Sequence, residues 1–392
     1  MYSYSLLRPL VFCGVYDRIY PIVQLTVKVK LLPTEQQKQS LLKTMEVFNA
    51  ACNYISQVAH QNKRFSQVPL HRDCYYDVRE KFNLSAQFVV RAIDKVSQSY
   101  RVEKKSVHKF KKYSAVIYDQ RLLSFKGLDS CSILTIDGRQ KMPIVIGQYT
   151  QLEGKKIRGQ ADLIYSRSKF FLCLVVEFPE GAPIDPEGVL GVDMGIVNIA
   201  TTSDGDIFSG EAVEKVREKT TRFKRALQKC GSKNAKRRLK KISGREARFK
   251  RNTNHVISKR IVSIAKDTRR AIGIEELKGF RVTVKKADRE RFGKWAFLQL
   301  REHIEYKARL AGVPVVSVNP RNTSRTCSNC GYVAKSNRKS QNLFSCNACG
   351  FSKHADINGA INIALLGSVN SRIAVHAETL TTAPPGTASQ QL

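Results

Sequence analysis

The chain of 392 residues lacks any apolar run of the roughly 18–20 residues that a membrane-spanning helix requires. Residues 1–12 hold one arginine and a brief apolar patch, and they lack the layout of a signal peptide. Internal repeats are also missing from the sequence. These absences count against a membrane protein, a secreted protein and a repeat protein, and we expect a soluble intracellular chain.

Acidic residues are scarce, because 33 Asp and Glu stand against 67 Lys and Arg and leave a net charge of +34. A charge of this size opposes compaction unless a partner neutralises it. Apolar residues make up 42% of the chain, which is enough for real cores and excludes wholesale disorder. We expect roughly two to four folded domains that bind a polyanion. Nucleic acid is the first candidate, and an anionic membrane surface is the second.

The first half of the chain alternates between strand and helix patterns. Residues 26–32 show the alternating polarity of a strand, and helical patterning with an apolar face follows over residues 34–105. From residue 114 the pattern returns to strands, two of which flank the hairpin turn Asp137-Gly138. We expect one β-rich module, residues 26–32 and 114–179, with the helical block inserted into it.

The second half follows a linker at residues 181–186 that contains Gly and Pro. Strands alternate with helices from there to residue 366, with a long polar helical stretch over residues 211–269. This order indicates a three-layer α/β domain and is compatible with an RNase H-like fold. Residues 367–392 are rich in Thr, Ser, Ala, Pro and Gln and are predicted to be a disordered tail.

Four of the ten cysteines form a pattern near the C-terminus. Cys327, Cys330, Cys346 and Cys349 follow Cys-x2-Cys-x15-Cys-x2-Cys, the spacing of a four-thiolate zinc site. Four protein ligands leave no open position for water or substrate, so such a site would be structural; two disulfides or free thiols are the alternative. The other six are expected to be reduced thiols in the core or at the surface: Cys13, Cys52, Cys74, Cys131, Cys173 and Cys230.

Three acidic residues lie where predicted strands or helices begin or end. Asp193 follows an apolar strand, Glu275 ends another, and Asp356 comes just after the cysteine cluster. Carboxylates in such places can converge on Mg²⁺, and two ions about 4 Å apart would clamp an in-line phosphodiester displacement. Each acid alone also fits a turn or cap residue. Glu276 competes with Glu275, since strand alternation does not tell which face holds the site.

Basic residues concentrate in residues 214–251, which contain 17 Lys or Arg and 3 Asp or Glu. A charged stretch can be a solvated helix face, but the excess of cations without a compensating acidic block favours nucleic-acid contact that weakens with salt. Aromatic residues such as Tyr76, Tyr100 and Phe110 can stack on bases, although core packing is expected for most of them. The candidate phosphate contacts are Lys236, Arg237, Arg238, Lys240, Lys241, Lys111 and Lys112.

Several motifs resemble those of the TnpB family, the transposon-encoded RNA-guided nucleases. Gly-Val-Asp-Met-Gly-Ile at residues 191–196 resembles the first RuvC-like motif, and Ile-Glu-Glu-Leu at residues 274–277 resembles the second. The segment at residues 323–350 resembles the zinc ribbon, and Asp-Ile-Asn-Gly-Ala-Ile-Asn-Ile at residues 356–363 resembles the third motif. Pro33-Thr34-Glu35 before a helix with Asn49 and Asn53 is also similar. The resemblance covers about residues 25–366.

The resemblance implies a multidomain fold. Residues 1–33 and 106–180 would form a β-barrel-like wedge domain, with residues 34–105 inserted as a helical recognition domain. Residues 185–366 would form the RNase H-like (RuvC) nuclease domain, with a zinc ribbon at residues 320–352 inside it. The chain departs from the family in residues 1–24, which extend beyond the usual start, and in Gly359, where alanine is commoner.

The resemblance also implies a function. The family binds a guide RNA from the transposon end and cleaves double-stranded target DNA beside a short adjacent motif. Asp193, Glu275 and Asp356 would be the catalytic acids holding two Mg²⁺ ions, and the four cysteines would hold one structural Zn²⁺. We expect a monomer in complex with RNA, in the cytoplasm and near the nucleoid of a prokaryote. A nuclease-inactive RNA-guided repressor and a DNA-joining transposase of the same fold are the alternatives.

Overall fold

The computed structural model describes residues 22–147, 152, 156–276 and 297–381. The described residues form two compact units, one spanning Ile22–Phe178 and the other beginning at Pro179. Most of the N-terminal extension predicted at residues 1–24 lies outside the described residues. None of the described helices combines the length and apolar character needed to cross a membrane.

The first unit is built on a seven-stranded sheet with the order β2-β6-β7-β1-β5-β4-β3. Tyr118 of β2 donates a hydrogen bond to the Leu134 carbonyl of β4 (3.0 Å), and the Leu134 amide donates to the Leu122 carbonyl (2.8 Å). The first bond joins β2, at one end of the sheet, to β4, next to the other end, so the sheet is nearly closed. The predicted hairpin at Asp137-Gly138 is confirmed by antiparallel pairing of β4 with β5. The strands are β1 (Ile22–Leu31), β2 (Val116–Asp119), β3 (Leu123–Lys126), β4 (Ser130–Thr135), β5 (Gly138–Val145), β6 (Lys156–Ser166) and β7 (Lys169–Pro179).

Three helices are inserted between β1 and β2, which confirms the predicted helical block: α1 (Glu35–Gln61), α2 (Gln67–Phe82) and α3 (Ala86–Val102). Thr34 begins α1 with a capping box, in which its side chain accepts from the Gln37 amide while the Gln37 side chain accepts from the Thr34 amide. The buried face of α1, including Met45 and Phe48, belongs to the same apolar core as the strands. Helices and sheet therefore fold as one unit.

Two asparagines of α1 fix the segment that leads from α3 to β2. Asn53 exchanges hydrogen bonds with the backbone of Phe110, donating to its carbonyl (3.0 Å) and accepting from its amide (2.7 Å). Asn49 donates to the Ser114 carbonyl (2.9 Å). The asparagines thus satisfy backbone groups of a segment that forms no regular structure.

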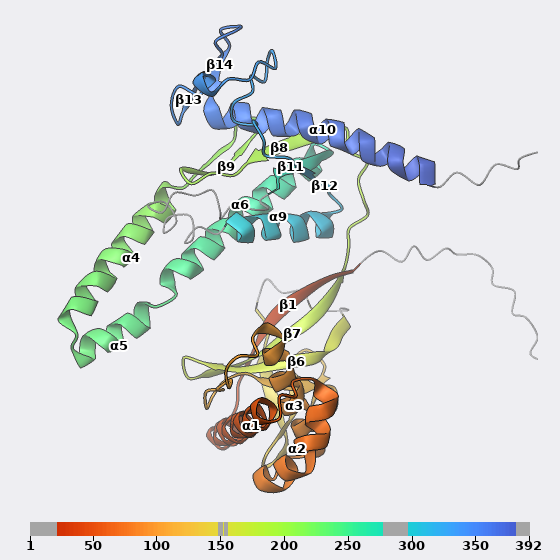
Figure 1. Ribbon diagram of the computed structural model, residues 1–392, viewed down its shortest axis with the longest axis vertical. Helices are drawn as coiled ribbons and strands as arrows, with labels where there is room; N and C mark the ends of the chain where they lie inside the picture. The colour runs from red at the N-terminus through yellow and green to blue at the C-terminus, as the bar shows by residue number, and fades with distance from the viewer. Residues whose placement is uncertain (1–21, 148–151, 153–155, 277–296, 382–392) are drawn as a thin grey trace, which may run out of the picture. The chain divides into compact units, whose positions relative to one another are not determined.

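The second unit contains a five-stranded sheet with the order β10-β9-β8-β11-β12. Strands β8, β11 and β12 are parallel, and β9 and β10 are antiparallel to their neighbours. Helix α10 covers one face of the sheet, and α6 and α9 cover the other (Figure 1). The predicted three-layer RNase H-like arrangement is confirmed. The elements are β8 (Gly188–Asp193), β9 (Asn198–Thr202), β10 (Ile207–Ser209), α4 (Glu211–Cys230), α5 (Lys233–Ile242), α6 (Arg245–Asp267), β11 (Arg270–Glu275), α9 (Phe297–Ala311), β12 (Val315–Val318) and α10 (Ala355–Thr381).

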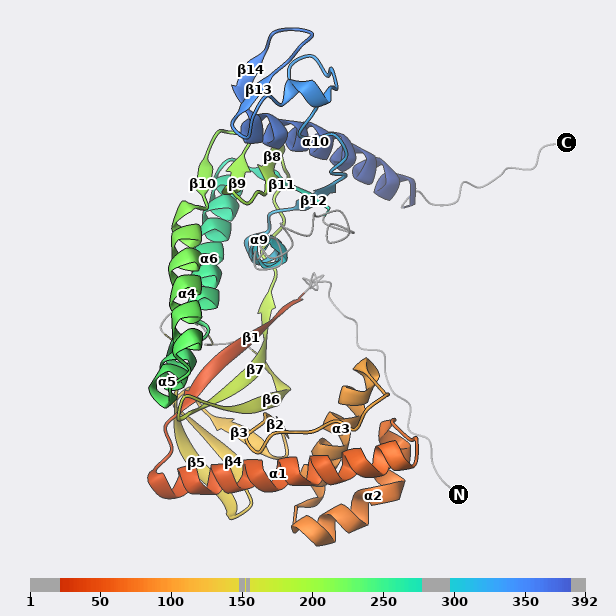
Figure 2. The same ribbon diagram turned by 60° about the vertical axis from the view of Figure 1, so that its left-hand side comes forward.

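The long polar stretch predicted as helical consists of three helices. Gly231 ends α4 and Gly244 precedes α6, both with the positive φ that favours glycine. Helices α4 and α6 lie side by side, with α5 joining them at the far end (Figure 2). We call residues 211–251 the basic arm.

The predicted start of a disordered tail at residue 367 is wrong, because α10 continues to Thr381. The helix still packs on the sheet at residues 367 and 370. A side chain at Gly367 would come 3.0 Å from Val189 of β8, and Asn370 donates a hydrogen bond to the Ser317 carbonyl of β12 (3.2 Å). Amino-acid composition indicated disorder here because it carries no information about such tertiary contacts. Residues 382–392 lie outside the described residues.

A pair of stacked histidines lies between α6 and α9. The rings of His255 and His303 are 3.9 Å apart and nearly parallel. Burial, followed by the charges of His255, Lys307 and Arg251, lowers the pKa of His303 from 6.5 to about 4. The pair is therefore neutral in the folded protein at neutral pH.

Acid should destabilise the second unit through this pair. Between pH 6.5 and about 4 the unfolded chain binds a proton that folded His303 does not, so stability falls as pH falls through that window. His303→Phe keeps a stacked ring and removes the titration. We expect a smaller drop in unfolding midpoint between pH 7 and pH 4.5 than in the parent, measured by urea denaturation. A drop in His303→Phe as large as that of the parent would contradict the prediction.

Candidate functional site

Two glycines let α10 approach the sheet closely. Gly191 of β8 and Gly273 of β11 are directly paired in register, each two residues before an acid. A Cβ atom at Gly191 would lie 1.9 Å from the Ala360 carbonyl oxygen, and one at Gly273 would lie 3.3 Å from the Ile363 carbonyl oxygen. The backbone of α10 therefore rests on these glycines, which brings its first turn to the ends of β8 and β11.

Gly191→Ala should disrupt this contact. The added methyl group would overlap backbone of α10, so the helix would have to shift, at a cost of about 1–3 kcal/mol or more. We expect a lower thermal unfolding temperature and a displaced Asp356, because Asp356 moves with the helix. Gly127→Ala is a control for substitution alone, since a Cβ there meets no atom within 4 Å, although its positive φ adds some strain. Unchanged stability in Gly191→Ala would contradict the close contact.

The structure brings together Asp193, Glu275 and Asp356, the three acids predicted from sequence. Asp193 ends β8, Glu275 ends the adjacent parallel strand β11, and Asp356 lies in the first turn of α10. Burial, with the nearby charges of Glu275 and Asp356, raises the pKa of Asp193 from 3.8 to about 7. A Cβ at Gly359 of α10 would come 3.1 Å from Asp193 Oδ2. The charges of Glu275 and Asp356 both act on Asp193, so three carboxylates, the kind of oxygen ligand that a divalent cation prefers, lie near one another.

Asp356 is held by two residues that the sequence did not reveal. Arg338 Nη2 donates to Asp356 Oδ1 (2.8 Å), and Asn198 Nδ2, from the start of β9, donates to Asp356 Oδ2 (2.9 Å). Asp356 is only 5% exposed, and Arg338 also lowers the pKa of Asp193. Arg338 comes from the segment between the two cysteine pairs, 18 residues before Asp356, and nothing in its local pattern indicates this contact.

Glu275 lies close enough to Asp193 for its charge to act on that carboxyl. Its charge raises the pKa of Asp193, and its Oε1 accepts a hydrogen bond from Thr323 Oγ1 (2.5 Å). Burial raises the pKa of Glu275, and the Thr323 bond lowers it. Glu276 follows the end of β11, and its backbone amide donates to the Val318 carbonyl of β12 (2.8 Å). These contacts favour Glu275, and its role as the second catalytic acid stays a prediction.

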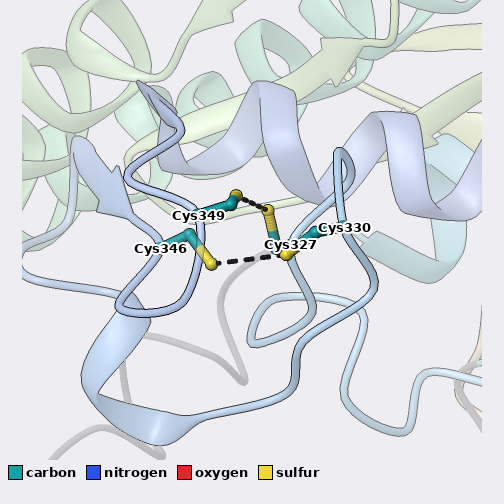
Figure 3. A group of neighbouring side chains, drawn as sticks. All are labelled: Cys327, Cys330, Cys346 and Cys349. Atoms are coloured by element: carbon teal, nitrogen blue, oxygen red, sulfur yellow. Dashed lines mark hydrogen bonds between the residues drawn. The ribbon is translucent and has the colours of Figure 1, made fainter.

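The four clustered cysteines form a compact set of sulfurs (Figure 3). Cys327 Sγ lies 3.8 Å from Cys349 Sγ, and Cys330 Sγ lies 3.6 Å from Cys346 Sγ. A tetrahedron with metal–sulfur distances of about 2.3 Å has edges of about 3.8 Å. The distances are far longer than the roughly 2.05 Å of a disulfide. The donor set and its geometry therefore fit one structural zinc ion and exclude the disulfide alternative.

The zinc-ribbon segment is fastened to α10 by two asparagines of the third motif. Asn358 accepts from the Ser328 amide (3.0 Å) and donates to the Thr326 carbonyl (2.8 Å). Asn362, one helical turn later, donates to the carbonyls of Thr323 and Thr326 (2.8 and 2.7 Å). Both side chains are almost fully buried. Their four-residue spacing on an otherwise apolar helix face is the sequence signal that could have indicated this role.

The scattered cysteines agree with their prediction as far as they are described. Cys52, Cys74 and Cys131 are buried free thiols, Cys173 is half-buried and Cys230 is exposed. Cys13 lies outside the described residues.

The basic arm exposes the cations that were predicted to contact phosphates. Ala235 is the buried residue of α5, and the arm also leaves Phe223 and Phe249 partly exposed, at 44% and 36%. In the first unit Lys111 is exposed, whereas Lys112 pairs with Glu46 (2.7 Å) and is thereby less available to a phosphate. The exposed predicted contacts on α5 are Lys236, Arg237, Arg238, Lys240 and Lys241.

Comparisons with known proteins agree with this site. Residues 174–279 match a family described as a probable transposase, OrfB of IS605, and residues 297–363 match the TNB domain of Cas12f1-like proteins. Together these matches span the strands and helices that carry the three acids. The TnpB resemblance of this region is confirmed. In this region the chain is homologous to TnpB-like and Cas12f1 proteins.

Individual relatives show the same relationship. The chain is 31% identical to a TnpB-like protein of Methanocaldococcus jannaschii over 172 residues, which is 42% of this chain and 60% of that protein. It is 30% identical to the CRISPR-associated endodeoxyribonuclease Cas12f1 of Sulfoacidibacillus thermotolerans over 217 residues, or 51% of this chain and 50% of that protein. The chain thus spans about half the length of these relatives.

A solved structure extends the likeness in fold to most of the chain. Cas12f1, in a complex with sgRNA and target DNA, superimposes with a TM-score of 0.54 over 84% of this chain and 83% of Cas12f1. The sequence identity is 13%, so this likeness concerns the fold alone.

Proposed function

We propose that the protein is an RNA-guided DNA endonuclease of an insertion-sequence transposon. The convergence of Asp193, Glu275 and Asp356 at one edge of an RNase H-like sheet carries the proposal. The names of its relatives support it, since they include an endodeoxyribonuclease and a TnpB-like protein. In this assignment the barrel-like sheet is the wedge domain and α1–α3 are the recognition domain.

The three acids are proposed to be the catalytic residues and to hold two Mg²⁺ ions. When bound, Mg²⁺ makes water a stronger nucleophile and offsets charge on the leaving oxygen. The chain's own residues position the donors: Arg338 and Asn198 fix the two oxygens of Asp356, and Thr323 fixes Glu275. Because two of the three carboxylates, Asp356 and Glu275, are held by side-chain hydrogen bonds, much of the donor set is preorganised for the cation.

The proposed partners are a guide RNA from the transposon end and double-stranded target DNA beside a short adjacent motif. In such a mechanism base pairing reads the sequence, and the protein holds the backbones. The basic arm supplies phosphate contacts for this task. We further propose a monomer in complex with RNA and one structural zinc ion. A location in the cytoplasm of a prokaryote, near the nucleoid, stays a prediction.

The function can be tested with RNA that copurifies with the protein. After sequencing of this RNA, duplex DNA matching its guide segment and carrying a library of flanking sequences is incubated with the complex and Mg²⁺. We expect cleavage of a subset of the library, which would also identify the adjacent motif. Binding without cleavage would favour the repressor, strand joining would favour the transposase, and absence of bound RNA would overturn RNA guidance.

A further inference from the structure

A pocket of about 300 Å³ opens in the first unit between the α1–α2 turn and the C-terminal end of α3. Ser66 and Gln67 line it from the start of α2, and Ser97 and Arg101 line it from α3. Its volume is at the lower end of the range of about 300–1,000 Å³ that small-molecule sites occupy. The assigned active site, in the other unit, does not use it.

An aromatic row forms one side of the pocket. The rings of Phe65 and Tyr100 are 4.7 Å apart, and Tyr100 also stacks on His108 at 4.3 Å. Tyr100 is fully buried, and its hydroxyl is hydrogen-bonded to Ser56, so the row is fixed in place. Phe65 is only half-buried, and the Lys104 ammonium lies over its ring, 5.9 Å from the centroid. The outer ring of the row is therefore Phe65, and the flexible side chain of Lys104 covers it.

The pocket is cationic and carries no acid. Arg101 and Lys104 both line it, both are exposed, and neither is paired with a carboxylate among the described residues. The neighbouring Glu103 accepts from Ser106 Oγ (2.7 Å) and from the Lys105 amide, so it is engaged in its own turn. Two unneutralised cations beside a pocket favour an anionic ligand.

Hydrogen-bonding groups complete the lining. Ser66 is the N-cap residue of α2, but its side chain makes no capping hydrogen bond. Ser97 is only 4% exposed and lines the pocket from α3, and Gln67 lines it from α2. A ligand suited to this pocket has a flat ring, polar ring edges and a negative charge.

We propose that the pocket binds one unpaired nucleotide of the nucleic acid that the protein carries. The base stacks on Phe65 in the place now covered by Lys104, and Lys104 and Arg101 contact the adjacent phosphate. Base stacking on an aromatic ring is the stronger interaction, so it displaces an exposed ammonium. A second pocket, of about 510 Å³, suits this ligand less because Glu80 lines it beside Tyr76 and Arg79. The inference rests on the proposed function, which supplies the nucleic acid.

Ultraviolet cross-linking of the intact complex tests the assignment directly. The protein bound to its copurified RNA is irradiated with and without the matching DNA, and cross-linked peptides are found by mass spectrometry. We expect a nucleotide on the peptide that contains Phe65. A ribonucleotide adduct in both samples identifies the RNA as the source, and a deoxyribonucleotide adduct only with DNA identifies the DNA.

Binding measurements provide a second readout. With the source strand as probe, Phe65→Leu should weaken binding about tenfold, because it keeps apolar packing and removes the stacking face. Arg101→Gln should reduce the slope of log affinity against log salt by about one. Arg72→Gln removes the same charge from an exposed site on α2 outside the pocket and should leave that slope unchanged.

The outcomes separate the pocket from the function as a whole. Cross-links confined to other peptides, together with parental binding by Phe65→Leu, would overturn the nucleotide pocket while guided cleavage stands. A protein that neither retains RNA nor cleaves DNA would overturn the proposed function itself. Equal thermal unfolding temperatures of Phe65→Leu and the parent show that weaker binding is not a folding defect.

Discussion

Asp193→Asn is expected to abolish DNA cleavage while leaving RNA and DNA binding intact. The substitution keeps the shape of the side chain but removes one charged oxygen donor from a set of three. Metal ions stabilise the transition state of such reactions by several kcal/mol, so we expect the cleavage rate to fall by roughly 10³-fold or more. Folding should not suffer, because burial, together with the charges of Glu275 and Asp356, already disfavours the ionised form of Asp193.

The experiment compares cleavage rates and affinities of one protein–RNA complex on the same labelled DNA duplex. Asp206→Asn is the matched control, because it makes the same chemical change at an exposed position between β9 and β10. The control should cleave at the parental rate. If Asp193→Asn also cleaves at that rate, the assignment of the three acids to catalysis is wrong.

Loss of the zinc site should have the second large effect. Cys346→Ser removes one of four thiolates, and zinc binding contributes on the order of 10 kcal/mol to the folding of small zinc domains. We expect the ribbon to unfold, since Cys327, Cys346 and Phe344 are the centre of its small core. Arg338 would then leave Asp356, so cleavage should fall below detection although the five-stranded sheet remains folded.

Three measurements follow this loss. Zinc content should fall from one equivalent per chain to near zero, and limited proteolysis should cut within residues 320–352 first. Far-ultraviolet circular dichroism should change little, because the ribbon contains only short strands and one helical turn, η1 (Lys335–Asn337), β13 (Leu343–Ser345) and β14 (Ser352–His354). Cys230→Ser, at an exposed thiol, is the control. Full zinc content with full cleavage in Cys346→Ser would contradict a structural role.

Local chemistry made much of the molecule predictable. The spacing of Cys327, Cys330, Cys346 and Cys349 determines a tetrahedral site almost by itself, because each pair is a short chelating turn. The strand patterns also predicted the hairpin at Asp137-Gly138 and the ends of β8 and β11. In these cases the residues that act together lie close in sequence or follow one period.

Long-range partners could not be predicted. Arg338 and Asn198 are ordinary polar residues in sequence, and only the folded chain brings them to Asp356. Strand alternation could not choose the second acid either, since Glu275 and Glu276 are adjacent and a strand points them to opposite faces; only the resemblance to the TnpB family indicated Glu275. The extent of α10 was missed because the packing of Gly367 and Asn370 on the sheet outweighs a composition typical of disorder.

The basic arm has a consequence for engineering the chain. It leaves the sheet after β10 and returns within α6, so its outer part contributes no strand and none of the three acids. The turns at Gly231 and Gly244 mark natural points for splicing. Shortening α4 and α6 by equal numbers of turns would give a smaller protein with an unaltered strand order. The length of the arm can thus be changed independently of the strands and acids of the sheet.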